Sequence, residues 1–105
     1  MDRSTFRQLL SRHIGSLLDQ HTLLKGAGYH AQGRVLQRRF STDTQAGYLI
    51  GEVKGQARTP YETGIRVLTA GKADVQLDSF CTCPVQYQCK HVAALLLAEL
   101  RGGPS

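Results

Sequence analysis

The first part of the chain has the hydrophobic pattern of an amphipathic helix. Over residues 4–18, apolar side chains recur at the spacing that lines one face of a helix. These side chains are Phe6, Leu9, Leu10, Ile14, Leu17 and Leu18. Thr5 followed by Gln8 has the form of a capping box, which predicts that the helix begins there. The pattern therefore predicts an N-terminal helix that packs one face against a core.

The other face of this helix is basic, and the segment that follows is ambiguous. Residues 19–33 contain two adjacent leucines that either prolong the helix or begin a second short one. The arginines on or near the polar face are Arg3, Arg7 and Arg12. The glycines expected to break helical structure are Gly26, Gly28 and Gly33.

From Arg34 onward the pattern becomes that of short strands. The segments are β-branched or aromatic, are bounded by turn-forming residues, and span 34–40, 47–54, 61–69 and 73–80. In the third segment the residues on one face are Tyr61, Thr63, Ile65, Val67 and Thr69. The connections between the segments have hairpin length, which favours an antiparallel meander.

Residues 89–100 return to a helical pattern that is apolar nearly all round. A helix of this kind is buried rather than lying on the surface. Gly102, Gly103 and Pro104 predict its end. Together the elements predict an α+β fold. It has an N-terminal helix, a four-stranded antiparallel sheet and a buried C-terminal helix.

Composition narrows the class of protein without deciding its function. A chain of 105 residues is expected to form a single compact unit. No apolar stretch approaches the ~20 residues of a membrane span, and the N-terminus lacks the apolar region of a signal peptide. We therefore expect a soluble cytoplasmic protein. The net charge of +5 is compatible with nucleic acid as a partner, and equally with an ordinary solvated surface.

The three cysteines of the chain lie close together and are followed by a histidine. The stretch reads Cys81-Thr-Cys83-Pro-Val-Gln-Tyr-Gln-Cys89-Lys-His91. An odd number of cysteines fits poorly with a disulfide framework, and such a cluster in a reducing compartment favours metal binding. Three cysteines and one histidine are a usual set for structural zinc. We predict that Cys81, Cys83, Cys89 and His91 are zinc ligands.

The local geometry expected of these residues supports the prediction. Cys81 and Cys83 leave a strand, where residues two apart point to the same side. Inside a regular helix, however, two residues that are two apart diverge by ~200°. Cys89 should therefore stand at or before the helix start, with His91 in the first turn. The positive end of the helix dipole would then offset part of the negative charge of the site.

Other uses of these cysteines fit less well. A disulfide between Cys81 and Cys83 would close a small, strained ring. A Cys89–His91 nucleophile pair would leave the other two cysteines unexplained. A catalytic zinc would need an open position for water, whereas four local ligands leave none. We therefore expect no enzymatic activity. Of our three hypotheses about function, a Cys-dependent enzyme ranks last.

Residues 81–91 resemble the SWIM zinc finger, whose signature is Cys-x-Cys, a variable spacer and Cys-x-His. Gly51-Glu-Val-Lys-Gly55, Pro60-Tyr61 and Cys89-Lys-His91-Val-Ala-Ala-Leu resemble the surrounding pattern in bacterial members. There the module precedes a Swi/Snf-type helicase ATPase. The resemblance covers roughly residues 33–100. It implies an N-terminal helical segment (1–32) and a SWIM-like zinc-binding domain (33–105).

Two hypotheses about function rank above that of an enzyme. The chain lacks the phosphate-binding loop of an ATPase, so it is either a fragment of a helicase-like protein or a free-standing module. The first hypothesis is a zinc-binding accessory module of such a protein, with DNA or RNA as its ligand and a helicase-type ATPase in cis. The alternative is a protein-interaction or purely structural zinc module.

The candidate nucleic-acid contacts are basic residues without a base-reading pattern. They are Lys54, Arg58, Lys90, Arg34 and Arg38, with Arg39 beside them. Arg34 and Arg38 alternate onto one strand face, which Leu36 and Phe40 share. Lys90 should point to solvent, because its two neighbours turn inward to the metal. Each of these residues could equally be an ordinary solubilising charge.

Overall fold

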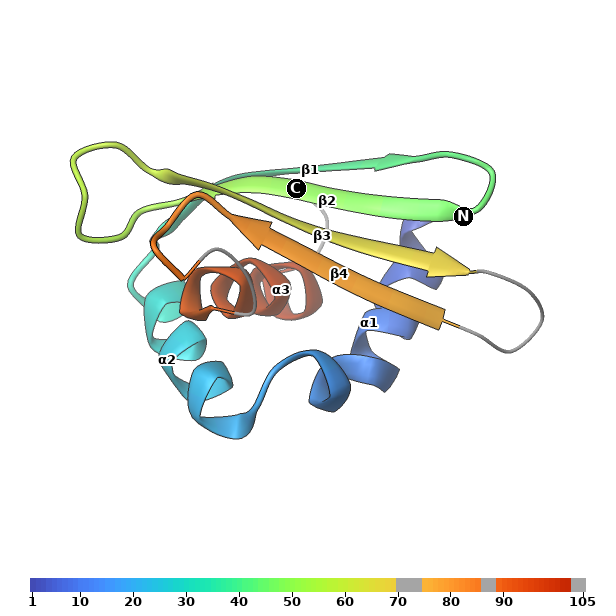
Figure 1. Cartoon of the computed structure of the whole chain (residues 1–105), viewed down its shortest axis with the longest axis horizontal. Coiled ribbons are helices and arrows are strands. Elements are labelled where there is room, and N and C mark those ends of the chain that lie inside the picture. The colour runs from blue at the N-terminus through green and yellow to red at the C-terminus, as the bar shows by residue number, and fades with distance from the viewer. Residues whose placement is uncertain (70–74, 86–88, 103–105) are drawn as a thin grey trace.

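A computed structural model describes residues 1–69, 75–85 and 89–102 of the chain (Figure 1). Its elements are α1 (Arg3–Leu17), α2 (Gln20–Ala31), β1 (Val35–Thr42), β2 (Ala46–Val53), β3 (Tyr61–Thr69), β4 (Val75–Cys81) and α3 (Lys90–Gly102). The predicted α+β class, with a four-stranded antiparallel sheet and a buried C-terminal helix, is confirmed. The predicted strand start at residue 73 and the helix stop at Gly103 and Pro104 lie outside the described residues.

The sheet is a meander in the order β1-β2-β3-β4, with each neighbouring pair antiparallel. Figure 1 shows α1, α2 and α3 together on one side of the sheet, and none of the described residues forms a helix on the other side. The inward residues of β2 and β3 are buried, among them Leu49, Val53, Ile65 and Val67. One face of the sheet is therefore core and the other is a surface.

Helix α3 lies at the centre of the core. The side chains of Val92, Leu95 and Leu96 have no exposed surface. The helix packs between the sheet and the two N-terminal helices (Figure 1). In the part of the chain that the structure describes, no helix is long and apolar enough to cross a membrane.

Helix α1 begins two residues before the predicted capping box. Asp2 is the N-cap, and its side chain accepts a hydrogen bond of 2.7 Å from the backbone N–H of Thr5. The Thr5–Gln8 capping box was therefore wrong. An Asp carboxylate is as good a cap acceptor as a Thr hydroxyl. The helix that Asp2 caps buries Phe6 and Leu10 in the core.

Residues 20–31 form a helix of their own, so the expectation that Gly26 and Gly28 break helical structure was wrong. Asp19 caps this helix by accepting from the N–H of Thr22. A Cβ added at Gly26 would lie 2.4 Å from the Cβ of Ala93. The glycine thus permits close packing of α2 on α3. The helix ends before Gly33, whose φ is 72°.

Strand β1 contains an irregularity that changes which residues share a face. Val35 pairs with Val53 and Gln37 with Glu52, so Leu36 is an extra residue in the strand. Leu36 is 53% exposed as a result. Arg38 and Phe40 point towards the helices instead. The expected alternation of Arg34, Leu36, Arg38 and Phe40 on one face was therefore wrong.

Candidate metal centre

The four predicted ligands come from two elements that meet at one end of α3. Cys81 is the last residue of β4, and Cys83 follows it by two positions. Cys89 directly precedes α3, and its carbonyl accepts a hydrogen bond of 3.0 Å from the N–H of Ala93. That bond is the first of the helix, so Cys89 occupies the cap position and His91 the first turn. Residues 86–88, between the two pairs of ligands, lie outside the described residues.

Three of the distances between the ligand atoms match the edges of a tetrahedral zinc site. The Sγ atoms of Cys83 and Cys89 are 3.6 Å apart. The Nδ1 atom of His91 lies 3.7 Å from the Sγ of Cys81 and 3.6 Å from that of Cys89. A tetrahedron with zinc–sulfur bonds of ~2.3 Å and a zinc–nitrogen bond of ~2.0 Å has edges of about 3.5–3.8 Å. His91 therefore presents Nδ1 to the metal.

The site is closed to solvent. Each of the four ligand residues is at most 5% exposed, and all four ligand atoms lie within 4.8 Å of one another. Three thiolates and one imidazole fill the four positions of a tetrahedral ion. Because α3 begins at this cluster, its positive dipole end faces the excess negative charge.

Hydrogen bonds around Cys81 favour its thiolate form. The largest contribution is a hydrogen bond with Cys89, and contacts with His91, Thr63 and the backbone of Cys83 add to it, against the opposing effect of burial. They lower the pKa of Cys81 to about 3. The hydroxyl of Thr63 lies 3.4 Å from the Cys81 sulfur. Thr63 is therefore an outer partner of a ligand that metal binding requires to be deprotonated.

The ring of His91 is held by three residues that sequence reasoning gave no role at the metal. Its centroid lies 4.6 Å from that of Tyr61 and 5.5 Å from that of Tyr29. A Cβ added at Gly55 would lie 2.4 Å from the Tyr61 ring and 2.9 Å from Nε2 of His91. Gly55 and Tyr61 belong to the sequence pattern that resembles SWIM proteins, so the sequence could have indicated their role. Tyr29, on α2, is not part of that pattern.

Four of the five predicted nucleic-acid contacts gather at this same end of the molecule. Arg34 donates to the carbonyl oxygens of Lys54 and Gly55 at 3.3 and 3.4 Å. Lys54 donates to the carbonyl of Arg58 at 2.9 Å. The cations of Arg34 and Lys90 lie 4.8 and 5.1 Å from the centroid of the Tyr29 ring. The structure thus brings Arg34, Lys54 and Lys90 together, with the backbone of Arg58 beside Lys54.

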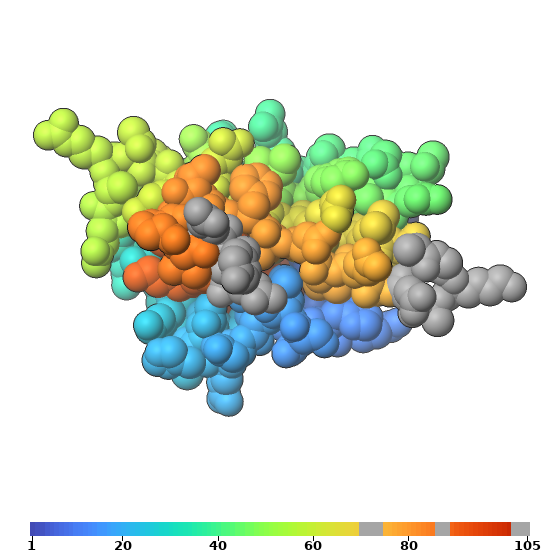
Figure 2. Space-filling view, viewed as in Figure 1, coloured from blue at the N-terminus to red at the C-terminus, as the bar shows by residue number. Residues whose placement is uncertain are grey.

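The space-filling view shows how these segments meet. The loop of residues 55–60, in yellow-green, projects at the same end as the orange residues after β4 and the cyan C-terminal part of α2 (Figure 2). Lys90 is only partly exposed, because its ammonium lies over Tyr29. Its expected orientation towards open solvent is corrected accordingly. Arg39 is exposed on β1.

Arg38 lies elsewhere, in a cluster of buried charge that the sequence did not reveal. The Glu99 carboxylate has no exposed surface and is paired with Arg3, Arg7 and Arg38. The Arg38 side chain is itself only 9% exposed. Arg3 donates two hydrogen bonds to Glu99, of 2.7 and 2.8 Å. Arg3 and Arg7 therefore do not point away from the core, as their place opposite the apolar stripe suggested.

The charge state of Glu99 follows from these partners. Burial opposes its ionisation, but the hydrogen bond from Arg3 and the charges of Arg3, Arg38 and Arg7 outweigh that effect. The pKa of Glu99 is lowered as a result. This cluster lies near the C-terminal end of α3, whereas the cysteine–histidine cluster lies at its N-terminal end.

Comparison with known proteins supports the metal assignment. The family model of the SWIM zinc finger matches residues 67–100, which contain all four ligands. A search of curated proteins and a search of solved structures each found no match to the chain. The family match and the Cys81, Cys83, Cys89 and His91 cluster together identify a zinc-binding module. The division of the chain at residues 32 and 33 stays a prediction.

Proposed function

We propose that this zinc module binds nucleic acid, mainly through its phosphates. The observation that supports the proposal best is the gathering of Arg34, Lys54, Arg58 and Lys90 beside the metal centre. The cations come from three parts of the chain, so their proximity depends on the fold that the zinc site stabilises. A cluster of one sign attracts an anionic polymer more than scattered charges do.

The contacts these cations already make leave their charge unneutralised. Arg34 and Lys54 donate to backbone carbonyls, and Arg34 and Lys90 lie over the Tyr29 ring. In each case the partner is neutral. Arg38 differs, because it is paired with the buried Glu99 carboxylate. We therefore leave Arg38 out of the proposed phosphate contacts.

The expected mode of binding is weak and indifferent to sequence. Base readout in the major groove requires an exposed helix or ribbon with suitable side chains. Helix α3 is buried from His91 to Glu99 and is not available for that role. Phosphate contacts alone position a protein without reading sequence, and their affinity falls steeply with salt.

The context we propose is that of an accessory module in a helicase-like protein. The resemblance of residues 33–100 to modules that precede a Swi/Snf-type ATPase supports it. In that setting the module would hold the nucleic acid while an ATPase in cis acts on it.

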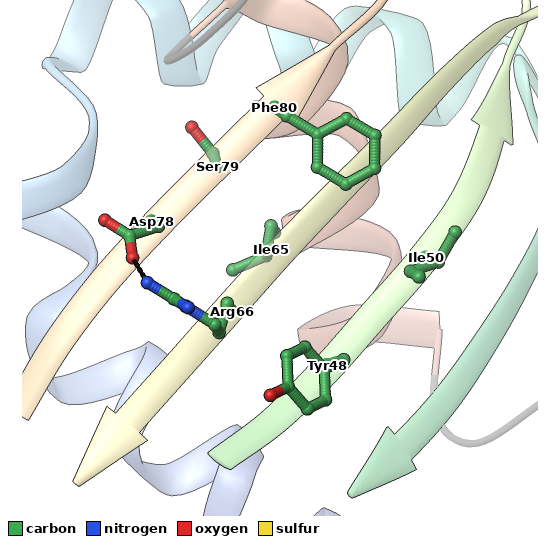
Figure 3. A pocket seen from close by; sticks show the side chains of 7 residues that line it. All are labelled: Tyr48, Ile50, Ile65, Arg66, Asp78, Ser79 and Phe80. Atoms are coloured by element: carbon green, nitrogen blue, oxygen red, sulfur yellow. Dashed lines mark hydrogen bonds and ion pairs between the residues drawn. The ribbon is translucent and has the colours of Figure 1, made fainter.

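One feature favours the alternative function, which is binding of a protein. On the helix-free side of the sheet, Tyr48, Ile50 and Phe80 border a hollow of about 540 Å³, beside the Arg66–Asp78 ion pair (Figure 3). Phe80 is 44% exposed. Large apolar side chains that adjoin on a surface are typical of protein interfaces.

Binding titrations at two salt concentrations test the proposal. Mixed-sequence single- and double-stranded DNA should bind at ~50 mM salt and be largely released at physiological salt. Replacing Lys54, Arg58 and Lys90 together by Gln should reduce the slope of the logarithm of the binding constant against the logarithm of the salt concentration by about three. A matched control replaces Arg12, Arg66 and Arg101, which are exposed elsewhere. If wild-type protein binds neither form at ~50 mM salt, the protein-interaction function takes the lead.

A further inference from the structure

We propose that the hollow beside the metal centre holds one unstacked base, so that the module prefers single-stranded nucleic acid over duplex. This inference rests on the proposed function and makes it more specific. The hollow, of about 230 Å³, is bordered by Tyr29, Gln56, Tyr61, Pro84, Val85 and Lys90, with Cys83 and His91 behind them. We call it the base hollow.

The size and lining of the base hollow suit a single flat ring system. Sites for drug-sized ligands occupy ~300–1,000 Å³, so this one is suited to a smaller group. Its walls are mostly apolar or aromatic, from Tyr29, Tyr61, Pro84 and Val85. Gln56 is exposed at its border and carries both a donor and an acceptor, which can meet the polar edge of a base.

The zinc site fixes the shape of the base hollow. The Tyr61 ring packs on His91 with centroids 4.6 Å apart, and His91 is a zinc ligand. Cys83, another ligand, also borders the hollow. The walls are thus in place before any ligand arrives, and a preformed site loses less conformational entropy on binding.

Charge distinguishes the base hollow from the hollow on the open side of the sheet. Lys90 borders the base hollow, and the cations of Lys90 and Arg34 both lie over the Tyr29 ring. No acidic residue is among the described residues that border this hollow. The hollow on the sheet contains Asp78 paired with Arg66, so these two charges offset each other. An anionic ligand is therefore favoured more beside Lys90 and Arg34 than on the sheet.

A path for the phosphate backbone continues past Lys90. A second hollow of about 250 Å³ lies beside it and is bordered by Thr22, Lys25 and Lys90. Lys25 on α2 thus lies next to Lys90. Gln56, at the border of the base hollow, belongs to the loop in which Lys54 donates to the carbonyl of Arg58. We expect a strand whose base enters the hollow to place its phosphates near these cations.

A duplex cannot use the base hollow, because its bases are paired and stacked on one another. Stacking of a base on an aromatic side chain is worth ~1–3 kcal/mol, which corresponds to about 5- to 150-fold in affinity. The same cations remain available to a duplex. We therefore expect single strands to bind about 5- to 150-fold more tightly than a duplex of the same length and sequence.

The experiment compares single-stranded DNA, single-stranded RNA and duplex DNA of one mixed sequence at ~50 mM salt. A copy of the DNA strand contains 2-aminopurine, whose fluorescence falls when it stacks. Tyr61→Leu should remove both the quenching and the preference for single strands, and Tyr61→Phe should retain both. Zinc content is measured for each variant, because Tyr61 also packs on a zinc ligand.

A second pair of variants avoids that contact. Val85→Ser removes an apolar wall of the base hollow, and Leu24→Ser is its control on α2. The two residues are 61% and 65% exposed, and Leu24 is not among the residues that border the hollow. Val85→Ser should weaken single-strand binding several-fold and leave duplex binding unchanged, whereas Leu24→Ser should change neither.

Each outcome decides between the two proposals. Tighter binding of single-stranded DNA or RNA with quenched 2-aminopurine supports the base hollow and shows which sugar is preferred. Equal, salt-sensitive binding of single strands and duplex overturns the base hollow and leaves the proposed function standing. Failure of all forms to bind at ~50 mM salt overturns both.

Discussion

Two clusters of polar groups hold the two ends of α3, and they are built in opposite ways. At the N-terminal end, three cysteines and a histidine from residues 81–91 surround a metal position. Near the C-terminal end, Glu99 is paired with arginines that are 61, 92 and 96 positions away in the sequence. One cluster is local in the sequence, whereas the other exists only in the folded chain.

The charges of the two clusters follow the direction of the helix. Three thiolates around a divalent ion leave a net negative charge at the positive end of the α3 dipole. Three guanidinium groups around one carboxylate leave a net positive charge near its negative end. Each sign is the one that its end of the helix favours. Between the clusters, the apolar residues of α3 form the centre of the core.

Loss of the metal should have the largest effect on this arrangement. Cys83→Ser or Cys89→Ser should abolish zinc binding and soluble expression, because α3 loses the attachment of its first turn. Structural zinc contributes ~10–16 kcal/mol in isolated fingers, which exceeds the whole stability of most small domains. Zinc content and soluble yield measure the effect. A soluble, folded Cys89→Ser protein would show that the metal is dispensable.

Removal of Glu99 should have the second largest effect. Glu99→Ala leaves three arginines facing one another, and breaking a buried ion pair by removing one partner costs ~3–5 kcal/mol. Urea denaturation measures the change, with zinc content as the control, since the two clusters are at opposite ends of α3. A loss of unfolding free energy below ~0.5 kcal/mol would mean that the arginines form other interactions that stabilise the fold equally well.

The pH dependence of this effect has a defined sign. Because the pKa of Glu99 is lowered in the folded protein, its ionisation stabilises the fold above the ordinary Glu pKa of ~4.3. That stabilisation is lost as the pH falls through the folded pKa. The stability difference between wild type and Glu99→Gln should therefore be largest at neutral pH and should narrow below pH ~4. A constant difference would contradict the ionised state.

A smaller effect is expected where α3 packs on α2, between the two clusters. A methyl group at Gly26 would collide with Ala93, including its backbone carbon at 2.8 Å. Gly26→Ala should therefore destabilise the protein by ~1–3 kcal/mol. Gly28→Ala is the control, because nothing lies within 4 Å of its Cβ position. It should stabilise the same helix by ~0.5–1 kcal/mol, and thermal melts of both variants measure the contrast.

The smallest effect is expected at Lys90, although it stands between two metal ligands. Its ammonium lies 5.1 Å from the Tyr29 centroid, an interaction worth ~0.5–1 kcal/mol at an exposed site. Lys90→Ala should leave zinc content unchanged and lower the melting temperature only slightly. A marked loss of zinc would show that Lys90 supports the metal centre rather than bordering it.

What the sequence could predict follows the same division between local and distant contacts. The ligands of the metal centre lie within one short stretch, so their residue types and spacing were sufficient to bring them together. The strands were found because their alternation is also local. The gaps between the predicted and observed strand boundaries are small, since only the ends depend on pairing.

The features that were missed depend on contacts between distant segments. The pairing of Arg38 with Glu99 joins β1 to α3, and no periodicity marks either residue. Gly26 looked like a helix breaker, because its close contact with Ala93 is visible only once α2 and α3 are packed. The extra residue at Leu36 similarly becomes apparent only from the pairing with β2.

The most direct test of the metal centre is X-ray absorption spectroscopy at the zinc edge of the purified protein. We expect one zinc per chain, with three sulfur neighbours at ~2.3 Å and one nitrogen at ~2.0 Å. The nitrogen contribution should disappear in a His91→Cys variant, while the three original sulfur neighbours remain. Absence of zinc from protein made with zinc available, or a shell with fewer than three sulfur atoms, would contradict a site built from Cys81, Cys83, Cys89 and His91.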